Sequence, residues 1–280
     1  MKNFKLKTLI AIMSAVISLG AFAKDETSNI SYEVKFVLDE KVLDSNDKSK
    51  VSESFIKTFD LGKVTPIKVV YIDTDKRTFL NEGWINRLRV KGGAKKFEYT
   101  FKKRYSVKDG NFDAALELAK ADGLIGAEGF EAEVDWSFDK MTLSYKFDAD
   151  ITNEGFGELE LPNLAEAVKT AGKNMPQTEV TAKGKKWGSK SLKKANFIGP
   201  VVFRRYKGKL NGQKIDVEVW PIENQKTKET TYFAELSFDA DSYEEAKNTR
   251  QIIMEKLSEL GVLKQESSLK TNAMYDAYTK

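Results

Sequence analysis

The sequence predicts an α+β protein built on a mostly antiparallel, eight-stranded closed β-barrel or tunnel, with helices packed outside it. Three observations support this prediction. Short segments alternate between apolar and polar residues with a period of two, which is typical of strands. Several of these segments place charged residues on one face and apolar residues on the other, as strands lining a charged tunnel would. Segments with helical spacing lie between them and after them.

The expected strands define the barrel. In chain order, the alternating segments are residues 30–38, 67–74, 84–91, 97–103, 130–138, 141–148, 200–207, 214–221 and 231–239.

Four segments are predicted to form helices, namely residues 46–60, 112–124, 161–171 and 242–260. The last is the clearest, because Ser242 is a good N-cap residue and Gly261 ends the pattern. Residues 174–196 are rich in Lys, Gly and Ser, so we expect a mobile loop insertion there. Its Lys-rich part, residues 183–194, is interpreted as a solvated loop.

The first 23 residues are predicted to be a cleaved signal peptide. Lys2, Lys5 and Lys7 form a basic start, residues 9–19 are apolar, and Ala21-Phe22-Ala23 is a typical cleavage site. The apolar stretch is too short to span a membrane. We therefore expect an exported protein, periplasmic or secreted, whose mature chain is a single domain of residues 24–280.

The residue counts exclude several kinds of chemistry. The chain has no histidine, which rules out imidazole bases, His-ligated zinc and Ser-His triads. It has no cysteine either, so the fold does without disulfides. Any metal would need carboxylate ligands, which favours a hard ion such as Mg²⁺, Mn²⁺ or Ca²⁺. After signal removal 43 basic and 42 acidic residues remain, a balance that does not indicate a nucleic-acid partner. The oligomeric state stays open.

Rows of charge lie on the predicted strands. Arg87, Arg89 and Lys91 share one face of their strand, and Lys102 lies on the polar face of the next. Other strands carry acidic rows, made of Glu33, Glu131, Glu133, Asp135, Asp216, Glu218 and Glu235. A solvated face of an antiparallel sheet would show the same alternation. The complementary signs instead favour a tunnel that binds a polyanion together with divalent cations.

Seven short motifs follow one another along the chain. They are Ser31-x-Glu33-x-Lys35, Tyr71-Ile72-Asp73-Thr74, Arg87-Leu88-Arg89, Thr100-Phe101-Lys102, Glu131-Ala132-Glu133, Arg204-Arg205-Tyr206 and Phe233-Ala234-Glu235-Leu236-Ser237. Their order resembles that of the CYTH superfamily of triphosphate tunnel metalloenzymes. This superfamily includes triphosphatases, thiamine-triphosphatase-like enzymes and class IV adenylate cyclases. The C-terminal residues 272–278 are similar to the ending common there.

The resemblance implies roles for residues of this chain. The phosphate-binding residues would be Lys35, Arg87, Arg89, Lys91, Lys102, Arg204 and Arg205, with the inward-facing member of the last pair left open. Of these, Lys35, Arg87 and Arg89 would serve catalysis. A Mg²⁺ or Mn²⁺ ion would be held by Glu33, Glu131, Glu133, Glu218 and Glu235. The ligand would be a small polyanion such as triphosphate or polyphosphate.

Two positions depart from the resembled motifs. Ser31 and Ser237 stand where glutamates are expected, so two carboxylates are missing from the implied metal site while the cations remain. Whether the protein is an enzyme therefore stays open. It is either an exported, metal-dependent hydrolase of triphosphate or polyphosphate, or a catalytically degenerate periplasmic anion-binding or scaffold protein. A sheet protein whose charged faces are simply solvated is the third possibility.

Overall fold

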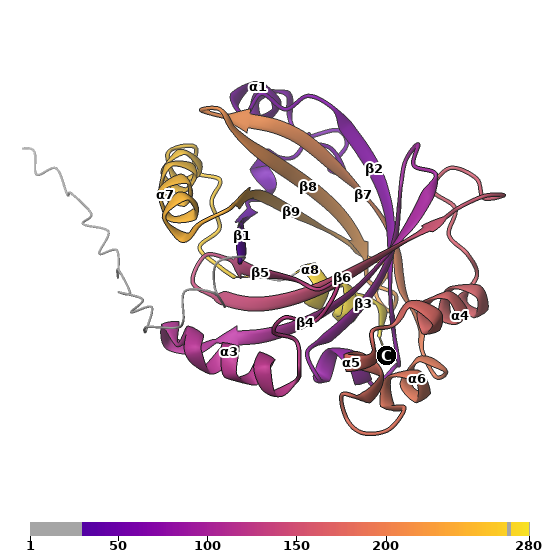
Figure 1. The fold of residues 1–280 in the computed structure, drawn as a ribbon. Helices are drawn as coiled ribbons and strands as arrows, with labels where there is room; N and C mark the ends of the chain where they lie inside the picture. Colours follow the sequence, from indigo (N-terminus) through magenta and orange to yellow (C-terminus); the bar gives the residue numbers. More distant parts are fainter. Residues whose placement is uncertain (1–29, 268–269, 280) are drawn as a thin grey trace, which may run out of the picture.

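The computed structural model describes residues 30–267 and 270–279, so the predicted signal peptide lies outside the described residues. Within them, nine strands close into one barrel in the order β1-β5-β6-β4-β3-β2-β7-β8-β9 (Figure 1). The strands are β1 Ser31–Leu38, β2 Val64–Asp73, β3 Trp84–Lys91, β4 Lys96–Val107, β5 Glu131–Trp136, β6 Met141–Thr152, β7 Asn196–Leu210, β8 Gln213–Glu223 and β9 Thr230–Ala240.

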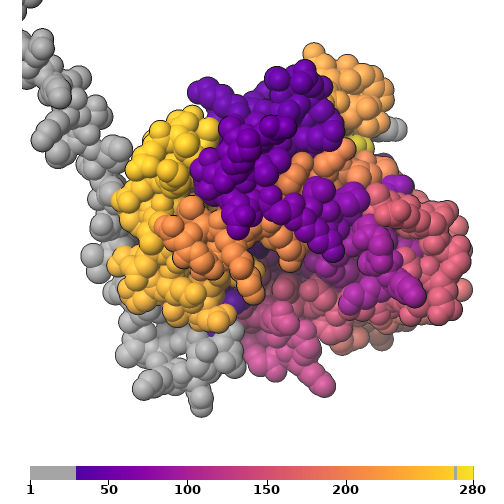
Figure 2. All heavy atoms as spheres, turned by 90° about the horizontal axis from the view of Figure 1, so that it is seen from above, coloured from indigo at the N-terminus to yellow at the C-terminus, as the bar shows by residue number. Residues whose placement is uncertain are grey.

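The α+β barrel is confirmed, but the expected count of eight strands is wrong by one. All nine alternating segments of the sequence form strands. Every neighbouring pair is antiparallel except β1 and β5, which run parallel. The short β5 fits between β1 and β6 and completes the ring there. The last strand also pairs with the first, so N-terminal and C-terminal segments lie side by side on the surface (Figure 2).

The helices cover the outside of the barrel and one of its ends. They are α1 Glu53–Thr58, α2 Thr78–Asn81, α3 Phe112–Ala121, α4 Leu164–Asn174, α5 Gln177–Thr181, α6 Trp187–Leu192, α7 Tyr243–Glu259 and α8 Lys270–Tyr278, with 3-10 turns at Glu40–Val42 and Lys108–Gly110. Helix α7 packs on β1 and β9, and α3 packs on β4 and β6 (Figure 1). No helix in the described part of the chain is long and apolar enough to cross a membrane.

Residues 174–196 do not form the expected loop. They contain the short helices α5 and α6, which pack against the barrel wall next to α2 and α4. Leu192 is buried, and the ring of Trp187 meets Phe79 edge-on with 5.2 Å between ring centroids. The Lys-rich composition hid these few apolar contacts, because each helix is too short to show a clear helical period.

Helix α8 closes one end of the barrel. Its residues Met274 and Tyr275 are fully buried against inward-facing apolar side chains of the strands, including Phe203 and Trp220. The hydroxyl of Tyr275 donates to the buried carboxylate of Asp73 at 3.2 Å. The same carboxylate accepts the backbone N–H groups of residues 74, 79 and 80, which fixes the turn after β2. Apolar side chains therefore fill the end of the barrel beneath α8.

Glu179 of α5 is a fully buried carboxyl group between that helix and the barrel wall. Burial, together with the nearby charge of Asp73, raises its pKa to about 8, although Asn86 and Lys103 act in the opposite direction. At neutral pH this side chain is therefore protonated in the folded protein and ionised in the unfolded chain.

Replacing Glu179 by glutamine should remove a pH dependence of stability. Because the folded pKa is raised, the stabilisation is fully present below the unfolded pKa near 4.5 and is lost as pH rises to about 8. The difference in unfolding free energy between wild type and Glu179→Gln should change by up to about 1.4 kcal/mol per pH unit in this window. Urea unfolding of both proteins from pH 5 to pH 9 measures it. A difference that does not vary with pH would show that Glu179 is ionised in the fold.

Candidate functional site

The barrel interior contains a cavity of about 680 Å³ beyond the apolar end. Its charged lining comes from residues that the strand alternation turns inward. Among the described residues, ten lysines and arginines line it against five carboxylates. The cations are Lys35, Arg87, Arg89, Lys102, Arg104, Lys146, Arg205, Lys207, Lys214 and Lys270. A concave site with this excess of positive charge attracts anions.

The most basic part of the cavity contains the guanidinium groups of Arg87, Arg89 and Arg205. Arg89 is largely buried and pairs with Glu98, its cross-strand neighbour on β4. Burial and the positive charges of Arg87 and Arg205 lower the pKa of Arg89. The three arginines are thus close enough to repel one another, and a bound anion would relieve this repulsion.

Arg87 has the least compensated charge of the three. It donates to Thr100 at 3.1 Å, and its Nε is buried without a hydrogen-bond partner. It takes part in none of the ion pairs found among the described residues. A half-buried guanidinium whose buried Nε has no partner provides a binding position for a phosphate or carboxylate group.

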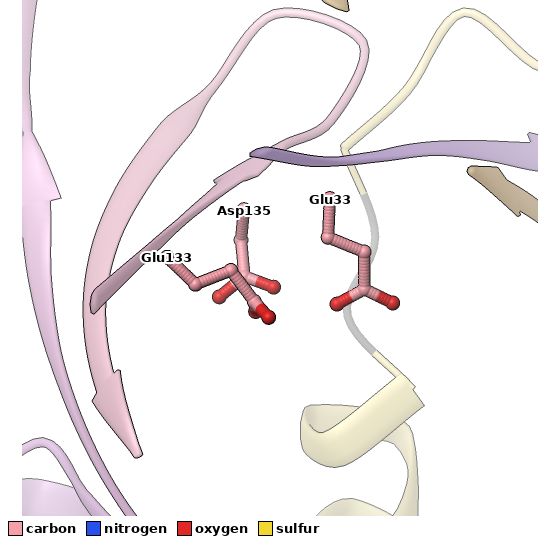
Figure 3. Close-up of side chains that lie close together, drawn as sticks. All are labelled: Glu33, Glu133 and Asp135. Atoms are coloured by element: carbon pink, nitrogen blue, oxygen red, sulfur yellow. The ribbon is translucent and has the colours of Figure 1, made fainter. Parts of the chain in front are cut away.

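Across the cavity, three carboxylates gather where β1 runs beside β5. Glu33, Glu133 and Asp135 each offer an oxygen within 4.8 Å of the others (Figure 3). Hard oxygen ligands at this spacing can hold a divalent cation. Strand alternation and the β1–β5 pairing bring these three acidic side chains together.

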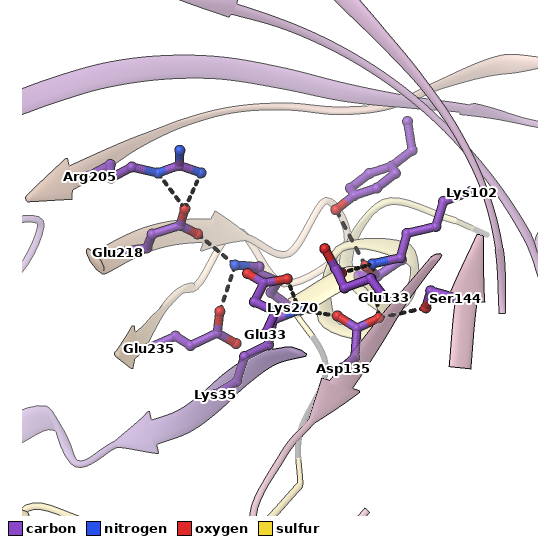
Figure 4. Close-up of polar contacts among 12 residues, drawn as sticks. Glu33, Lys35, Lys102, Glu133, Asp135, Ser144, Arg205, Glu218, Glu235 and Lys270 are labelled. Atoms are coloured by element: carbon purple, nitrogen blue, oxygen red, sulfur yellow. Dashed lines mark hydrogen bonds and ion pairs between the residues drawn. The ribbon is translucent and has the colours of Figure 1, made fainter. Parts of the chain in front are cut away.

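Two lysines already contact this carboxylate cluster. Lys35 pairs with Asp135 and with Glu33, at 2.6 Å from the latter. Lys102 lies 2.8 Å from both Glu133 and Asp135 (Figure 4). Burial would raise the pKa of Asp135, but Lys102 and Lys35 hold it well below its usual value. Burial and the neighbouring carboxylates raise the pKa of Glu133, although Lys102 opposes them. Three carboxylates thus share two ammonium groups, and the remaining negative charge is available to a proton or a metal ion.

A second acidic pair lies on β8 and β9. Glu218 and Glu235 are both almost fully buried and both contact Lys270 at 2.6 Å (Figure 4). Glu218 also forms an ion pair with Arg205, with 2.6 Å between its Oε1 and Nη2 of the arginine. These two residues were expected to join Glu33 and Glu133 at a metal, but their closest cation is instead a lysine of the protein itself.

Four predicted site residues do not line the cavity, and one of them is Glu235, the buried partner of Lys270. Arg204 points away from it and donates to the backbone carbonyl of Ser49 at 3.0 Å, so the inward member of the arginine pair is Arg205. Lys91 lies at the end of β3, half-exposed, and pairs with Glu98. Glu131 is largely exposed at the start of β5 and pairs with Lys146 at 3.2 Å. The alternation placed Glu131 on the correct face, but the position lies too near the strand end to reach the acidic cluster.

The two serines in place of glutamates are close to the acidic cluster. Ser31 is the cross-strand partner of Glu133, and Ser237 is the partner of Lys35 and lines the cavity. Glutamates at both positions would add two carboxylates beside the cluster. Their absence leaves the cluster with only the three carboxylates described above.

Sequence reasoning missed two residues of the site. Asp135 was recognised on an acidic face but was not assigned to the metal set, because the resembled motif ends at Glu133. Lys270 had no strand pattern to reveal it. The spacing of Thr271, Met274 and Tyr275 is typical of a helix face, which could have predicted α8 but not the direction of its first side chain.

Comparisons with known proteins rest on structure alone. No protein-family model matches the chain, and no curated protein matches it in sequence. The fold is similar to that of a candidate adenylyl cyclase from Hippeastrum, described as having a dominant triphosphatase activity. The TM-score is 0.51 at 10% identity, covering 86% of this chain and 93% of that one. A candidate adenylate cyclase from Bacillus halodurans gives a TM-score of 0.48 at 12% identity, covering 87% and 96%. At such identities the first match shows a shared fold only.

Proposed function

We propose that this protein, which has the CYTH-like tunnel fold, binds a phosphate-rich anion such as inorganic triphosphate in its barrel cavity. The observation that carries the proposal is the guanidinium of Arg87, whose buried Nε has no partner and which lies with Arg89 and Arg205 in the cavity lining. A chain of phosphate groups carries several charges at short intervals, so it can neutralise Arg87 and contact Arg89 and Arg205 at the same time. The triphosphatase activity described for the Hippeastrum protein supports the same ligand class.

The alternative of a merely solvated charged face has less support. The cations in question lie inside a closed barrel and are largely buried, with the side chain of Arg89 only 15% exposed. Charged side chains held in such a position without a ligand cost desolvation free energy. A bound anion offsets this desolvation cost. On a solvated outer face the same side chains would stay hydrated, and the cost would be negligible.

Arg87→Gln should abolish most of the anion binding and leave the fold intact. Arg87 forms no ion pair among the described residues, and Glu98, on which its charge also acts, keeps Arg89 and Lys91 as partners. Removing Arg87 therefore leaves no carboxylate unpaired and relieves repulsion at Arg89. Loss of one charged hydrogen-bonding group costs about 1.5–3 kcal/mol. The Kd for tripolyphosphate in EDTA, measured by calorimetry, should therefore rise about 10- to 100-fold.

Arg204→Gln is the matched control, because Arg204 lies on the outer face of β7. It should bind tripolyphosphate as the wild type does. Equal weakening by the two substitutions would mean that the anion binds on the protein surface, and no binding by the wild type would refute the proposal.

A second candidate function is metal-dependent hydrolysis of the bound anion, and the cluster of Glu33, Glu133 and Asp135 supports it. These carboxylates fit one Mg²⁺ or Mn²⁺ ion, because they supply three hard oxygen ligands and carry one charge more than the two lysines neutralise. Such an ion would polarise the phosphate oxygens. Arg87, Arg89 and Lys102 would orient the anion and stabilise charge on it, and Lys35 would adjust the charge of the acidic cluster.

Ser31 and Ser237 favour binding without catalysis, since each removes a carboxylate from the neighbourhood of the metal ligands. The alternative function is therefore a catalytically degenerate anion-binding or scaffold protein on the same fold. The two alternatives share the anion site and differ only in whether a metal ion acts on the anion.

Phosphate release separates the two alternatives. A hydrolase should release phosphate from tripolyphosphate with Mg²⁺ or Mn²⁺ and not with EDTA. Glu133→Gln should then weaken metal binding by at least about tenfold, while Glu131→Gln, which changes the exposed carboxylate of the same strand, should have no effect. Tripolyphosphate binding without release in any metal would identify the binding protein.

We also propose that the protein acts outside the cytoplasm, on the basis of residues 1–23. Intact-mass analysis of the protein purified from its native host should find Lys24 as the first residue. A chain that retains Met1 would refute export by this route. Nucleoside triphosphates are scarce outside the cytoplasm, so export favours an inorganic polyphosphate over a nucleotide as the ligand.

A further inference from the structure

Glu218 and Glu235 are directly opposite each other in the antiparallel pairing of β8 with β9. Like charges in this arrangement repel, and here each side chain is at most 5% exposed. Two buried carboxylates that face each other need a cation between them. In a barrel expected to hold divalent metals, that cation could be a metal ion or a group of the protein.

The protein supplies this cation as Lys270. Its Nζ lies 2.6 Å from Glu218 and 2.6 Å from Glu235, so one ammonium group bridges both carboxylates (Figure 4). Both carboxylates raise the pKa of Lys270 against the effect of burial, so it stays charged. The lysine occupies the position between the two carboxylates that a bridging metal ion would need.

Glu218 has no oxygen left for a metal ion. Its Oε1 accepts a hydrogen bond from Nε of Arg205 at 2.8 Å and lies 2.6 Å from Nη2 of the same guanidinium in an ion pair. Its Oε2 accepts from the indole of Trp220 at 2.8 Å and from Lys270. These three hydrogen bonds and the ion pair engage both oxygens of the carboxylate, which has about four lone-pair sites. Burial alone would raise the pKa of Glu218, but Lys270 and Arg205 lower it, which keeps the group ionised and bound to these donors.

The position of Lys270 in its helix also requires an explanation. It is the first residue of α8, where the helix dipole disfavours a cation. The buried carboxylate pair offsets this cost. The rest of α8 is anchored independently, by Tyr275 on Asp73 and by Arg77, which pairs with Asp276 at 2.7 Å. The helix thus holds the ammonium group in place.

We propose that Lys270 is a resident cation that excludes divalent metal from the Glu218–Glu235 pair. This inference deepens the proposed function, because it leaves Glu33, Glu133 and Asp135 as the place for a divalent ion in the cavity. The tunnel would then hold at most one such ion, and the end of the anion near Arg205 would be bound without metal.

Titration of the mature, EDTA-stripped protein with Mn²⁺, in the absence of any phosphate, tests the inference. The wild type should bind no more than one equivalent. Lys270→Gln should bind one equivalent more than the wild type, because it releases one buried oxygen of Glu218 and the carboxylate of Glu235. Its melting temperature should be lowered in EDTA and raised again by Mn²⁺.

Two control variants make the result specific. Lys214→Gln removes another lysine of the cavity lining that is exposed and forms no ion pair among the described residues, so its Mn²⁺ stoichiometry should equal that of the wild type. Lys270→Gln/Glu235→Gln removes one ligand of the new site and should lose the additional ion.

Two equivalents bound by the wild type would overturn the inference, and so would a folded Lys270→Gln protein that gains none. If Lys270→Gln does not fold, the wild-type stoichiometry decides alone: two equivalents overturn the inference, and one or none supports it. Since no phosphate is present, these results do not depend on whether tripolyphosphate binds. A wild type with no Mn²⁺ site and a variant with one would support the role of Lys270 and refute the metal site on Glu33, Glu133 and Asp135.

Discussion

Charged side chains that a closed barrel turns inward must find counter-charges inside the same barrel, and this requirement organises the structure. Strand register provides most of them. Arg205 is opposite Glu218, and Arg89 is opposite Glu98, so pairs form directly across neighbouring strands. Breaking a buried pair of this kind costs about 3–5 kcal/mol because the remaining charge has no water. The charges that the register leaves unpaired are therefore the ones to which a function can be assigned, and Arg87 is the clearest of them.

Helix α8 covers one end of the barrel interior and supplies a counter-charge that the strands do not provide. Its Met274 and Tyr275 cover the apolar end of the barrel interior, and its first residue, Lys270, supplies the cation that the facing glutamates lack. The buried carboxylate of Asp73 connects these roles, since it binds Tyr275 and also the turn after β2. Asp73, a residue of the Tyr71-Ile72-Asp73-Thr74 motif, thus has a structural role, because it holds helix α8 against the barrel.

Strand alternation predicted most of the barrel and the composition of its lining, because a period of two fixes the face of each side chain. It did not predict which of Arg204 and Arg205 faces inward. Val201 and Val202 precede them, and the outer face of β7 is partly exposed, so neither face has a clear apolar pattern. Alternation also gives the face but not the depth of a residue, which is why Glu131 was grouped with Glu133 although it lies at the exposed strand end. Lys270 comes from a helix, to which strand alternation does not apply.

The balance between binding and catalysis depends on charge in the acidic cluster. With glutamates at positions 31 and 237, the lysines at 35 and 102 would leave several negative charges for metal ions. With serines there, Glu33, Glu133 and Asp135 exceed these two lysines by a single charge. A divalent ion would reverse that excess unless a polyanion bound with it, so metal and phosphate should bind cooperatively or the metal should bind weakly. The serines at these two positions do not affect Arg87, Arg89 and Arg205. Anion binding is therefore the property that this structure retains most completely, and any catalysis would depend on a metal ion that arrives with its substrate.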